Sequence, residues 1–414
     1  MRVSVRRGLT AAVTAALTAS LTLTAAAVSD AAPATAAVPA DFYTPPGPLP
    51  SGRNGDVIKS AESAYRNAEA TRIMYLSRDA KDHVIPVTGT VIVPTKEWTG
   101  PGPRPIVAYT PFTAGLSDQC APSKTLAREG SRDLLSALQN GFVDALLGKG
   151  FAVAQTDYEG MGVPTATAYA IRRSEAHTTL DAIRAAQRLP GTGLPKDGPV
   201  GVAGYSQGGG ASAAAAELAS SYAPELDLKG AFVGAPPANK DAAAKSFDGG
   251  MYSGFLGLLL ADLDTAYPEA RLLDLFNDQG RRYLQEARTK CALDVVFSYW
   301  GKDTEDLTKD GRPVAEHLSR PPFDAIVAEN KLGTVKPSVP TMVDQAPNDD
   351  VLPFEEQGRQ LAEDWCAKGA TVQLKKIPVL LPLLSHVRAM PTAWGDAADW
   401  LTDRFAGKPA TSTC

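Results

Sequence analysis

The chain has 414 residues and a net charge of −5 at pH 7, because 41 Lys and Arg face 46 Asp and Glu. No basic cluster breaks this mild acidity, which argues against nucleic acid as a partner. No second long apolar run follows the N-terminal one, so the sequence predicts no stable membrane span.

The N-terminus reads as an export signal. Arg2, Arg6 and Arg7 form a basic start, and residues 9–28 are an apolar stretch rich in Ala, Leu and Thr. Ala34-Thr35-Ala36 then offers an A-x-A cleavage site. We therefore expect residues 1–36 to be a signal peptide and the mature protein to be secreted and extracellular.

Cysteine usage fits that compartment. The chain has four cysteines, and an even number in an exported protein predicts two disulfides, for which three pairings exist. No C-x-x-C pair or Cys/His cluster suggests a metal site, so we expect neither metal nor cofactor. The cysteines are Cys120, Cys291, Cys366 and Cys414.

The N-terminal part of the mature chain begins without regular structure. Residues 37–68 are rich in proline and predict an extended arm. Residues 71–77 and 84–93 are rich in β-formers and predict a hairpin whose turn is residues 78–82. A short buried strand is expected at residues 105–110.

Strands then alternate with helical patterns. Helices are predicted at residues 130–149 and at 168–189, the second with Thr167 as a possible N-cap, and strands at 151–155 and 230–234. This rhythm is typical of βαβ units and a parallel sheet. We therefore expect an α/β fold with a mostly parallel central sheet flanked by helices.

The rhythm stops between residues 241 and 335, where only helical stretches occur. This predicts a helical cap inserted between an N-terminal core part, residues 37–240, and a C-terminal core part, residues 336–414. The second part carries the last elements, expected as strands at 340–345 and 371–379 and helices at 354–368 and 389–405.

A G-x-S-x-G motif, Gly204-Tyr205-Ser206-Gln207-Gly208, follows an apolar run at 200–203 and precedes an Ala-rich helical run. Strand, sharp turn and helix are the context in which this motif is a nucleophile elbow. Because a serine hydroxyl is a poor nucleophile near neutral pH, Ser206 needs a base within reach and a carboxylate that orients the base.

In α/β-hydrolases those partners follow the serine in the order acid, then histidine. Of four histidines, His386 comes after the last predicted strand and before the last helix, whereas His83 and His177 precede the elbow and His317 lies in the predicted cap. The acid is expected just past the strand that ends near residue 345. Spacing alone leaves Asp349 and Asp350 open, with Asp344 a distant third.

Acyl transfer to a serine turns the carbonyl oxygen of the substrate into an oxyanion, which needs hydrogen-bond donors. The residue after the nucleophile, Gln207, supplies one backbone N–H. The second donor is expected from the loop at 111–115; Pro111 has no N–H, which leaves Thr113 or Ala114 as candidates.

Taken together, these residues resemble the secretory lipases of the lipase-A type, which are α/β-hydrolases with a helical cap. The resemblance runs from about residue 41 to the end. Its blocks lie at residues 120–123, 157–160, 204–209, 349–353, 385–386 and 400–409, followed by Cys414.

The resemblance implies several assignments. It favours Asp349 over Asp350 as the acid and places the second oxyanion donor near Ala114, where some relatives have Asp. It pairs Cys120 with Cys291 and Cys366 with Cys414.

The implied function is that of a triacylglycerol lipase or carboxylic ester hydrolase, with Ser206, Asp349 and His386 as its triad. We expect a monomer that acts on lipid esters. One version of this hypothesis has the enzyme meet its substrate at a lipid–water interface. One alternative is an exopeptidase that uses Asp262 and Asp264 as a clamp for the substrate amine. Others are a non-lipolytic carboxylesterase and an inactive binding protein on the same scaffold.

Overall fold

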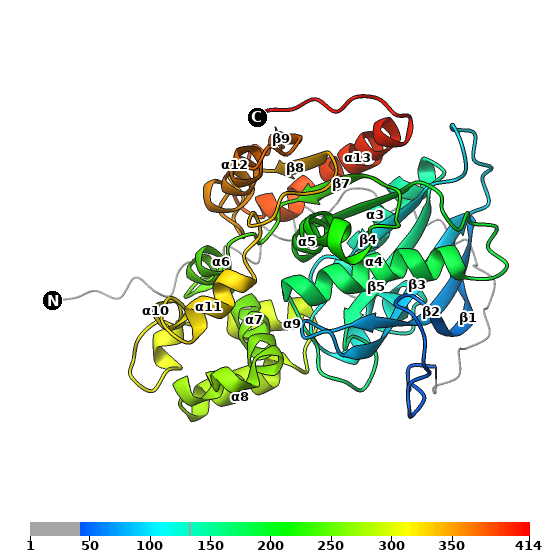
Figure 1. Cartoon of the computed structure of the whole chain (residues 1–414). Coiled ribbons are helices and arrows are strands. Elements are labelled where there is room, and N and C mark those ends of the chain that lie inside the picture. The colour runs from blue at the N-terminus through cyan, green and yellow to red at the C-terminus, as the bar shows by residue number, and fades with distance from the viewer. Residues whose placement is uncertain (1–41, 132–133) are drawn as a thin grey trace, which may run out of the picture. The chain divides into compact units, whose positions relative to one another are not determined.

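The computed structural model describes residues 42–131 and 134–414, so the predicted signal peptide lies outside the described residues. In the described part, a sheet of nine strands forms the centre of the fold, in the order β1-β2-β3-β5-β4-β6-β7-β8-β9 (Figure 1). The strands are β1 (Val57–Tyr65), β2 (Ala68–Arg78), β3 (Val84–Pro94), β4 (Ile106–Thr110), β5 (Ala152–Glu159), β6 (Val200–Tyr205), β7 (Leu228–Gly234), β8 (Thr341–Gln345) and β9 (Val372–Lys376).

Strand directions divide the sheet into two parts. The first three strands pair antiparallel as two hairpins, and β3 is antiparallel to β5. From β5 through β4, β6, β7 and β8 to β9, every pair is parallel. The mostly parallel sheet predicted from the sequence is therefore confirmed. Its parallel strands bring their carboxyl ends to one edge, where sites of such folds are built.

Helices cover both faces of the sheet. One face packs against α3 (Leu134–Gly148) and α13 (Ser385–Phe405), and the other against α4 (Arg172–Arg188), α5 (Gln207–Tyr222) and α12 (Gln360–Ala367). Alanine fills the sheet side of α5, which favours the helix and lets it lie close to the strands. A short helix, α2 (Pro122–Leu126), follows β4.

The segment between β7 and β8 is helical, and we call residues 240–335 the cap. Its core joins Leu256 and Leu260 to Phe276, Tyr283 and Leu318. The cap helices lie beside one another on one side of the sheet (Figure 1). They are α6 (Lys240–Phe247), α7 (Ser253–Ala266), α8 (Asp278–Ala287), α9 (Ala292–Tyr299), α10 (Val314–Leu318) and α11 (Phe323–Glu329).

Three predictions about local structure are wrong. Residues 57–65, expected in the irregular arm, form the edge strand β1, whose polar sequence hides its pairing with β2. The helix predicted from residue 168 begins at Arg172, so its N-cap is Ile171 and not Thr167, whose hydroxyl donates to Asp262 Oδ1 at 2.8 Å instead. The last helix begins at Ser385 rather than 389, so that His386 lies in its first turn.

Both disulfides have the pairing that the resemblance implies. Cys120 bonds to Cys291, which links the loop after β4 to the cap, and Cys366 bonds to Cys414, which holds the C-terminal segment against α12. No helix among the described residues is long and apolar enough to cross a membrane.

Candidate active site

Ser206 sits in the sharp turn between β6 and α5. Its φ of 58° lies in the left-handed region, which costs about 1–3 kcal/mol for a residue with a side chain. The turn is held because Ser206 N donates to Gly234 O at 2.9 Å and Gly210 N to Ser206 O at 3.0 Å. A side chain at Gly208 would collide with the carbonyl of Thr110. The strand, turn and helix that make a nucleophile elbow are therefore present.

His386 and Asp349 are bonded to each other. His386 Nδ1 lies 2.8 Å from Asp349 Oδ2, and both side chains are almost completely buried. The other carboxylate oxygen accepts the N–H groups of Val351 and Leu352, at 3.0 and 2.9 Å. These bonds fix the carboxylate and through it the orientation of the imidazole, leaving Nε2 as the nitrogen available to a nucleophile.

Asp350 binds the backbone around the histidine instead. Its carboxylate accepts the N–H of Leu384 at 2.8 Å and the N–H of His386 at 3.0 Å. These are orphan donors at the N-terminus of α13, where a negative charge is favoured. Asp350 therefore explains why the helix begins before His386. Asp344 is buried in β8, and its neighbour is Asp396 rather than the histidine.

Tyr205, the residue before Ser206, contacts both the ring and the backbone of His386. The rings of Tyr205 and His386 are 5.0 Å apart between centroids, and Tyr205 Oη donates to His386 O at 2.8 Å. Among the hydrogen bonds of the described residues, none joins Ser206 Oγ to His386. Catalytic hydrogen bonds of this kind are often long without substrate and tighten when it binds.

The predicted oxyanion donors lie at two adjoining pockets. Gln207 lines both pockets, Thr113 lines the one that contains Ser206, and Ala114 lines the other. Within the described residues, no hydrogen-bond acceptor lies against the N–H of Gln207, Thr113 or Ala114. The pocket lining thus favours Thr113, whereas the resemblance favours Ala114.

The loop that carries the candidate donors, residues 111–115, is attached to the cap, and we call it the donor loop. Ala292 N donates to Ala114 O at 2.9 Å and Leu116 N to Lys290 O at 3.2 Å, on either side of an antiparallel bridge between Gly115 and Cys291. The backbone of the donor loop is therefore paired with a cap segment.

The pocket that contains Ser206 is mostly apolar and lies between core and cap. Phe247, Phe255 and Leu259 line it from the cap, and Val351 and Leu352 line it from residues 346–354 after β8, which we call the acid loop. Such a lining suits a hydrocarbon chain rather than a charged group.

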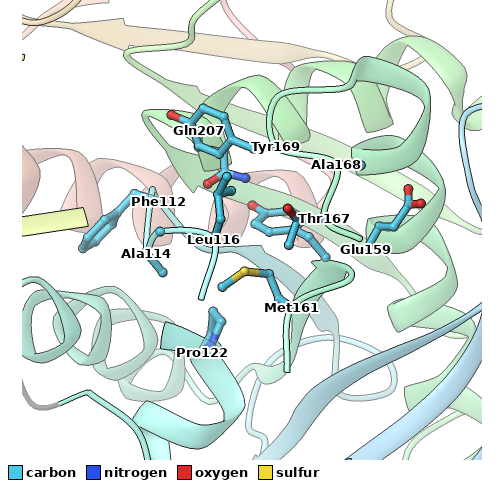
Figure 2. Close-up of a pocket in the computed structure, with 12 residues that line it drawn as sticks. Phe112, Ala114, Leu116, Pro122, Glu159, Met161, Thr167, Ala168, Tyr169 and Gln207 are labelled. Atoms are coloured by element: carbon cyan, nitrogen blue, oxygen red, sulfur yellow. The ribbon is translucent and has the colours of Figure 1, made fainter. Parts of the chain in front are cut away.

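The second pocket extends from the donor loop toward β5. Phe112 and Ala114 lie at one end and Glu159 at the other, with Met161 and Pro122 along one side (Figure 2). Burial raises the pKa of Glu159 to about 7, against the opposing hydrogen bond from Ser174.

Two buried charged groups stand close to the elbow and carry no motif. Glu175 of α4 is 3% exposed, and burial raises its pKa to about 7 while the charge of Lys240 opposes the rise. Lys240 lines the Ser206 pocket, and burial lowers its pKa to about 8. Sequence reasoning missed both, because one acidic residue inside a helix and one lysine after a strand carry no spacing signal.

The residues suggested as an amine clamp are already engaged. The carboxylate of Asp262 is fully buried. It accepts hydrogen bonds from Thr167 Oγ1 at 2.8 Å and from Tyr169 N at 2.5 Å. Asp264 pairs with Arg288 at 3.5 Å. Neither carboxylate lines the pockets described above. In the described residues, no group of three or more His, Cys, Asp or Glu side chains is placed to hold a metal ion.

Comparison with known proteins gives a consistent family. The model of a family described as secretory lipase matches residues 132–413. A Mycobacterium tuberculosis protein named a probable inactive lipase is 32% identical over 386 residues, covering 89% of this chain and 82% of its own. A secreted triacylglycerol lipase of Malassezia globosa is 29% identical, covering 90% of this chain and 82% of its own.

Among solved structures, Candida antarctica lipase A in its closed state is similar, with a TM-score of 0.78 and 25% identity over 90% of this chain and 88% of that one. An esterase from Xanthomonas oryzae that degrades rice cell walls has a TM-score of 0.72 at 19% identity, over 85% of this chain and 100% of that one. The second likeness concerns the fold alone.

Proposed function

Because the chain belongs to the secretory lipase family, we propose that it hydrolyses carboxylic esters of lipids through a serine nucleophile. The observation that carries this proposal is the bond of 2.8 Å between His386 Nδ1 and Asp349 Oδ2, beside an elbow that presents Ser206. These are a base, its orienting acid and a nucleophile, in the chain order of α/β-hydrolases.

The first half of the reaction makes an acyl-enzyme. Ser206 Oγ attacks the ester carbonyl carbon while His386 Nε2 takes the hydroxyl proton, and Asp349 stabilises the imidazolium that forms. The negative charge on the former carbonyl oxygen is stabilised by the N–H of Gln207 and by a second donor from the Thr113–Ala114 segment. Collapse of the tetrahedral intermediate breaks the ester bond, and the imidazolium gives its proton to the departing alcohol oxygen.

The second half regenerates the enzyme. A water molecule attacks the acyl carbon while His386 accepts its proton, and the same donors stabilise the second tetrahedral intermediate. Its collapse breaks the bond to Ser206, whose oxygen recovers the proton from His386. The products are a carboxylic acid and an alcohol, and no cofactor takes part.

The substrate class follows from the pocket. Apolar side chains from the cap and the acid loop surround Ser206, which favours an ester with a hydrocarbon acyl chain. Triacylglycerol is the substrate class in the names of several relatives, and we propose lipid esters of this class for the present chain.

We also propose that the enzyme works at a lipid–water interface. Leu380, Leu381 and Leu383, just before His386, are 99%, 59% and 59% exposed. Exposed apolar patches of this kind are typical of surfaces that contact a partner or a lipid. This segment is anchored to the acid loop, since Asn348 Nδ2 donates to Val379 O at 3.0 Å.

Export is part of the proposal. Two disulfides lie in the described residues, and such bonds persist in oxidising compartments. Several relatives are named as secreted lipases. We therefore assign the mature protein to the outside of the cell.

Of the alternative functions, the exopeptidase loses support and the inactive protein needs a direct test. The exopeptidase lacks its clamp, because Asp262 and Asp264 are bonded within the protein. An inactive protein is the alternative that the name of one relative raises. The presence of Ser206, His386 and Asp349 in this chain argues against it.

The test uses purified wild type and Ser206→Ala. Wild type should hydrolyse p-nitrophenyl esters and be labelled at Ser206 by a fluorophosphonate, whereas the variant should do neither and still fold, as judged by circular dichroism. Turnover retained by Ser206→Ala, or a wild type that is neither active nor labelled, would contradict the proposal.

A further inference from the structure

One buried carboxylate joins the elbow to the wall of the substrate pocket. Glu175 Oε1 accepts two hydrogen bonds, one from Gln207 Nε2 at 2.9 Å and one from Ala170 N at 3.0 Å. Glu175 and Gln207 are 3% and 6% exposed, so water does not compete with this contact. The residue that supplies the first oxyanion donor through its backbone is thus held by its side chain as well.

From this arrangement we infer that Glu175 is a positioning residue for the oxyanion site: it fixes Gln207 so that the backbone N–H of Gln207 points at the developing negative charge. The inference rests on the proposed function, since it assigns no chemistry of its own to Glu175.

The first turn of α5 leaves a backbone donor free. Gln207 is the first residue of that helix, and its N–H has no acceptor among the described residues. The direction of this N–H is set by the backbone of Ser206 and Gln207. The bond from Ser206 N to Gly234 O fixes the turn from the strand side, and the bond from Gln207 to Glu175 fixes it from the α4 side. Donors held in advance stabilise a transition state without reorganising.

Glu175 also holds the pocket wall at Ala170. The φ of 58° at Ala170 is unusual for a residue with a side chain, and Ala170 lines the same pocket as Ser206. Because one carboxylate oxygen binds both Ala170 N and Gln207 Nε2, Glu175 sets the distance between the pocket wall and the elbow. A neighbouring contact extends this brace to the donor loop, since Tyr169 Oη and Thr113 Oγ1 lie 2.9 Å apart.

The side chain and the backbone of Gln207 have different roles in this arrangement. Gln207 Nε2 is engaged by Glu175, so it does not serve as the donor to substrate, and the backbone N–H takes that role. An isosteric glutamine at position 175 keeps an acceptor oxygen, whereas alanine removes it and leaves two buried donors without a partner.

The experiment measures kcat and KM with soluble p-nitrophenyl butyrate, and Ki for phenylboronic acid, whose tetrahedral adduct with Ser206 places an oxygen in the oxyanion site. Variants are Glu175→Ala, Glu175→Gln, Gln207→Ala and the double alanine variant. The control is Glu217→Ala, which removes an equally buried carboxylate farther along α5, bonded to Arg172, Trp365 and Gly333.

For Glu175→Ala and Gln207→Ala we expect kcat to fall about 10- to 100-fold, less than the loss of a complete donor, with KM within about threefold. The Ki for phenylboronic acid should rise by the factor by which kcat/KM falls. The double variant should be no worse than the worse single variant, because both remove one contact. Glu175→Gln should stay within about threefold of wild type, and Glu217→Ala should lower Tm but not kcat.

Several results would overturn the inference: multiplying losses in the double variant, a Glu175→Gln as slow as Glu175→Ala, or a kcat loss no larger than that of Glu217→Ala. If Glu175→Ala does not fold, Gln207→Ala decides, and an unchanged kcat and Ki refute the inference. Inactive or unlabelled wild type refutes the proposed function instead.

Discussion

Asp349 and Asp350 are neighbours in sequence, yet their carboxylates bind different parts of the same residue: Asp349 binds the ring of His386, and Asp350 its backbone N–H. The first interaction orients a base, and the second holds the start of a helix. Under the proposed function, we therefore expect the two aspartates to have unequal effects on catalysis despite their equal charge and adjacent position.

Replacement of Asp349 by asparagine should lower kcat about 10³- to 10⁴-fold, because an amide stabilises neither the required tautomer nor the imidazolium. The measurement is kcat with a p-nitrophenyl ester. Asp350→Asn is the matched control, and we expect it to lower Tm and to reduce kcat by about tenfold or less. A larger kcat loss in Asp350→Asn would exchange the two roles.

A second prediction concerns stability and pH. Burial and the adjacent Asp396 carboxyl together raise the pKa of Asp344 to about 8, against the opposing charge of Lys375. Neither oxygen of Asp344 has a hydrogen-bond donor among the described residues, so a proton on this carboxyl pair supplies the missing one.

Because the folded pKa of Asp344 lies above its unfolded value, its proton stabilises the fold fully below about pH 4. That stability is lost as pH rises through about 8, by at most about 1.4 kcal/mol per pH unit. Asp344→Asn should remove this dependence and gain stability over wild type at pH 9. The check is urea unfolding at pH 5, 7 and 9; parallel curves for the two proteins would contradict it.

A third prediction concerns the two disulfides, which close loops of 171 and 48 residues. By loop entropy alone, they stabilise the fold by about 5 and about 4 kcal/mol. Replacing Cys120 and Cys291 by serine should also lower kcat/KM, because this bond lies beside the donor loop. The Cys366/Cys414 double serine variant should lose stability only. Equal kcat/KM in the two variants would contradict this difference.

A fourth prediction tests the exposed leucines. A variant with serine at positions 380, 381 and 383 should hydrolyse soluble p-nitrophenyl butyrate at the wild-type rate but act at least about tenfold more slowly on a triolein emulsion. The physical reason is the loss of apolar area, worth about 25 cal/mol per Å² on transfer out of water.

The control for the leucines is Val335→Ser, which changes an exposed apolar residue in the segment before β8. On either side of it, Gly333 and Ser338 are bonded to α5. The emulsion rate of this variant should equal that of wild type. If the triple serine variant keeps its emulsion rate, these leucines do not contact lipid.

The sequence predicted most of the parallel sheet, because buried strands such as β6 are uninterrupted apolar runs. It also placed Ser206 at a strand–helix turn, since a local motif describes that turn fully. β1 escaped prediction because its sequence has little apolar alternation and its position depends on pairing with β2.

Residues whose importance depends on distant neighbours were not predictable in this way. Spacing left Asp349 and Asp350 equivalent, and only the family resemblance favoured Asp349. The fold adds the physical difference, a ring contact for Asp349 and a backbone contact for Asp350. Glu175 lies 32 residues before Gln207 in the chain. Its carboxylate reaches the elbow because α4 and α5 pack side by side, which is a tertiary effect without a sequence pattern.

The pairing of the donor loop with residues 290–292 has a consequence for protein engineering. The cap looks like an exchangeable module, since it is one continuous insertion between β7 and β8. However, Ala292 N and Lys290 O complete the backbone pairing of the loop next to the elbow. A chimera that takes its cap from another family member must therefore keep this short segment and its cysteine, or the graft will alter the catalytic edge along with the substrate preference.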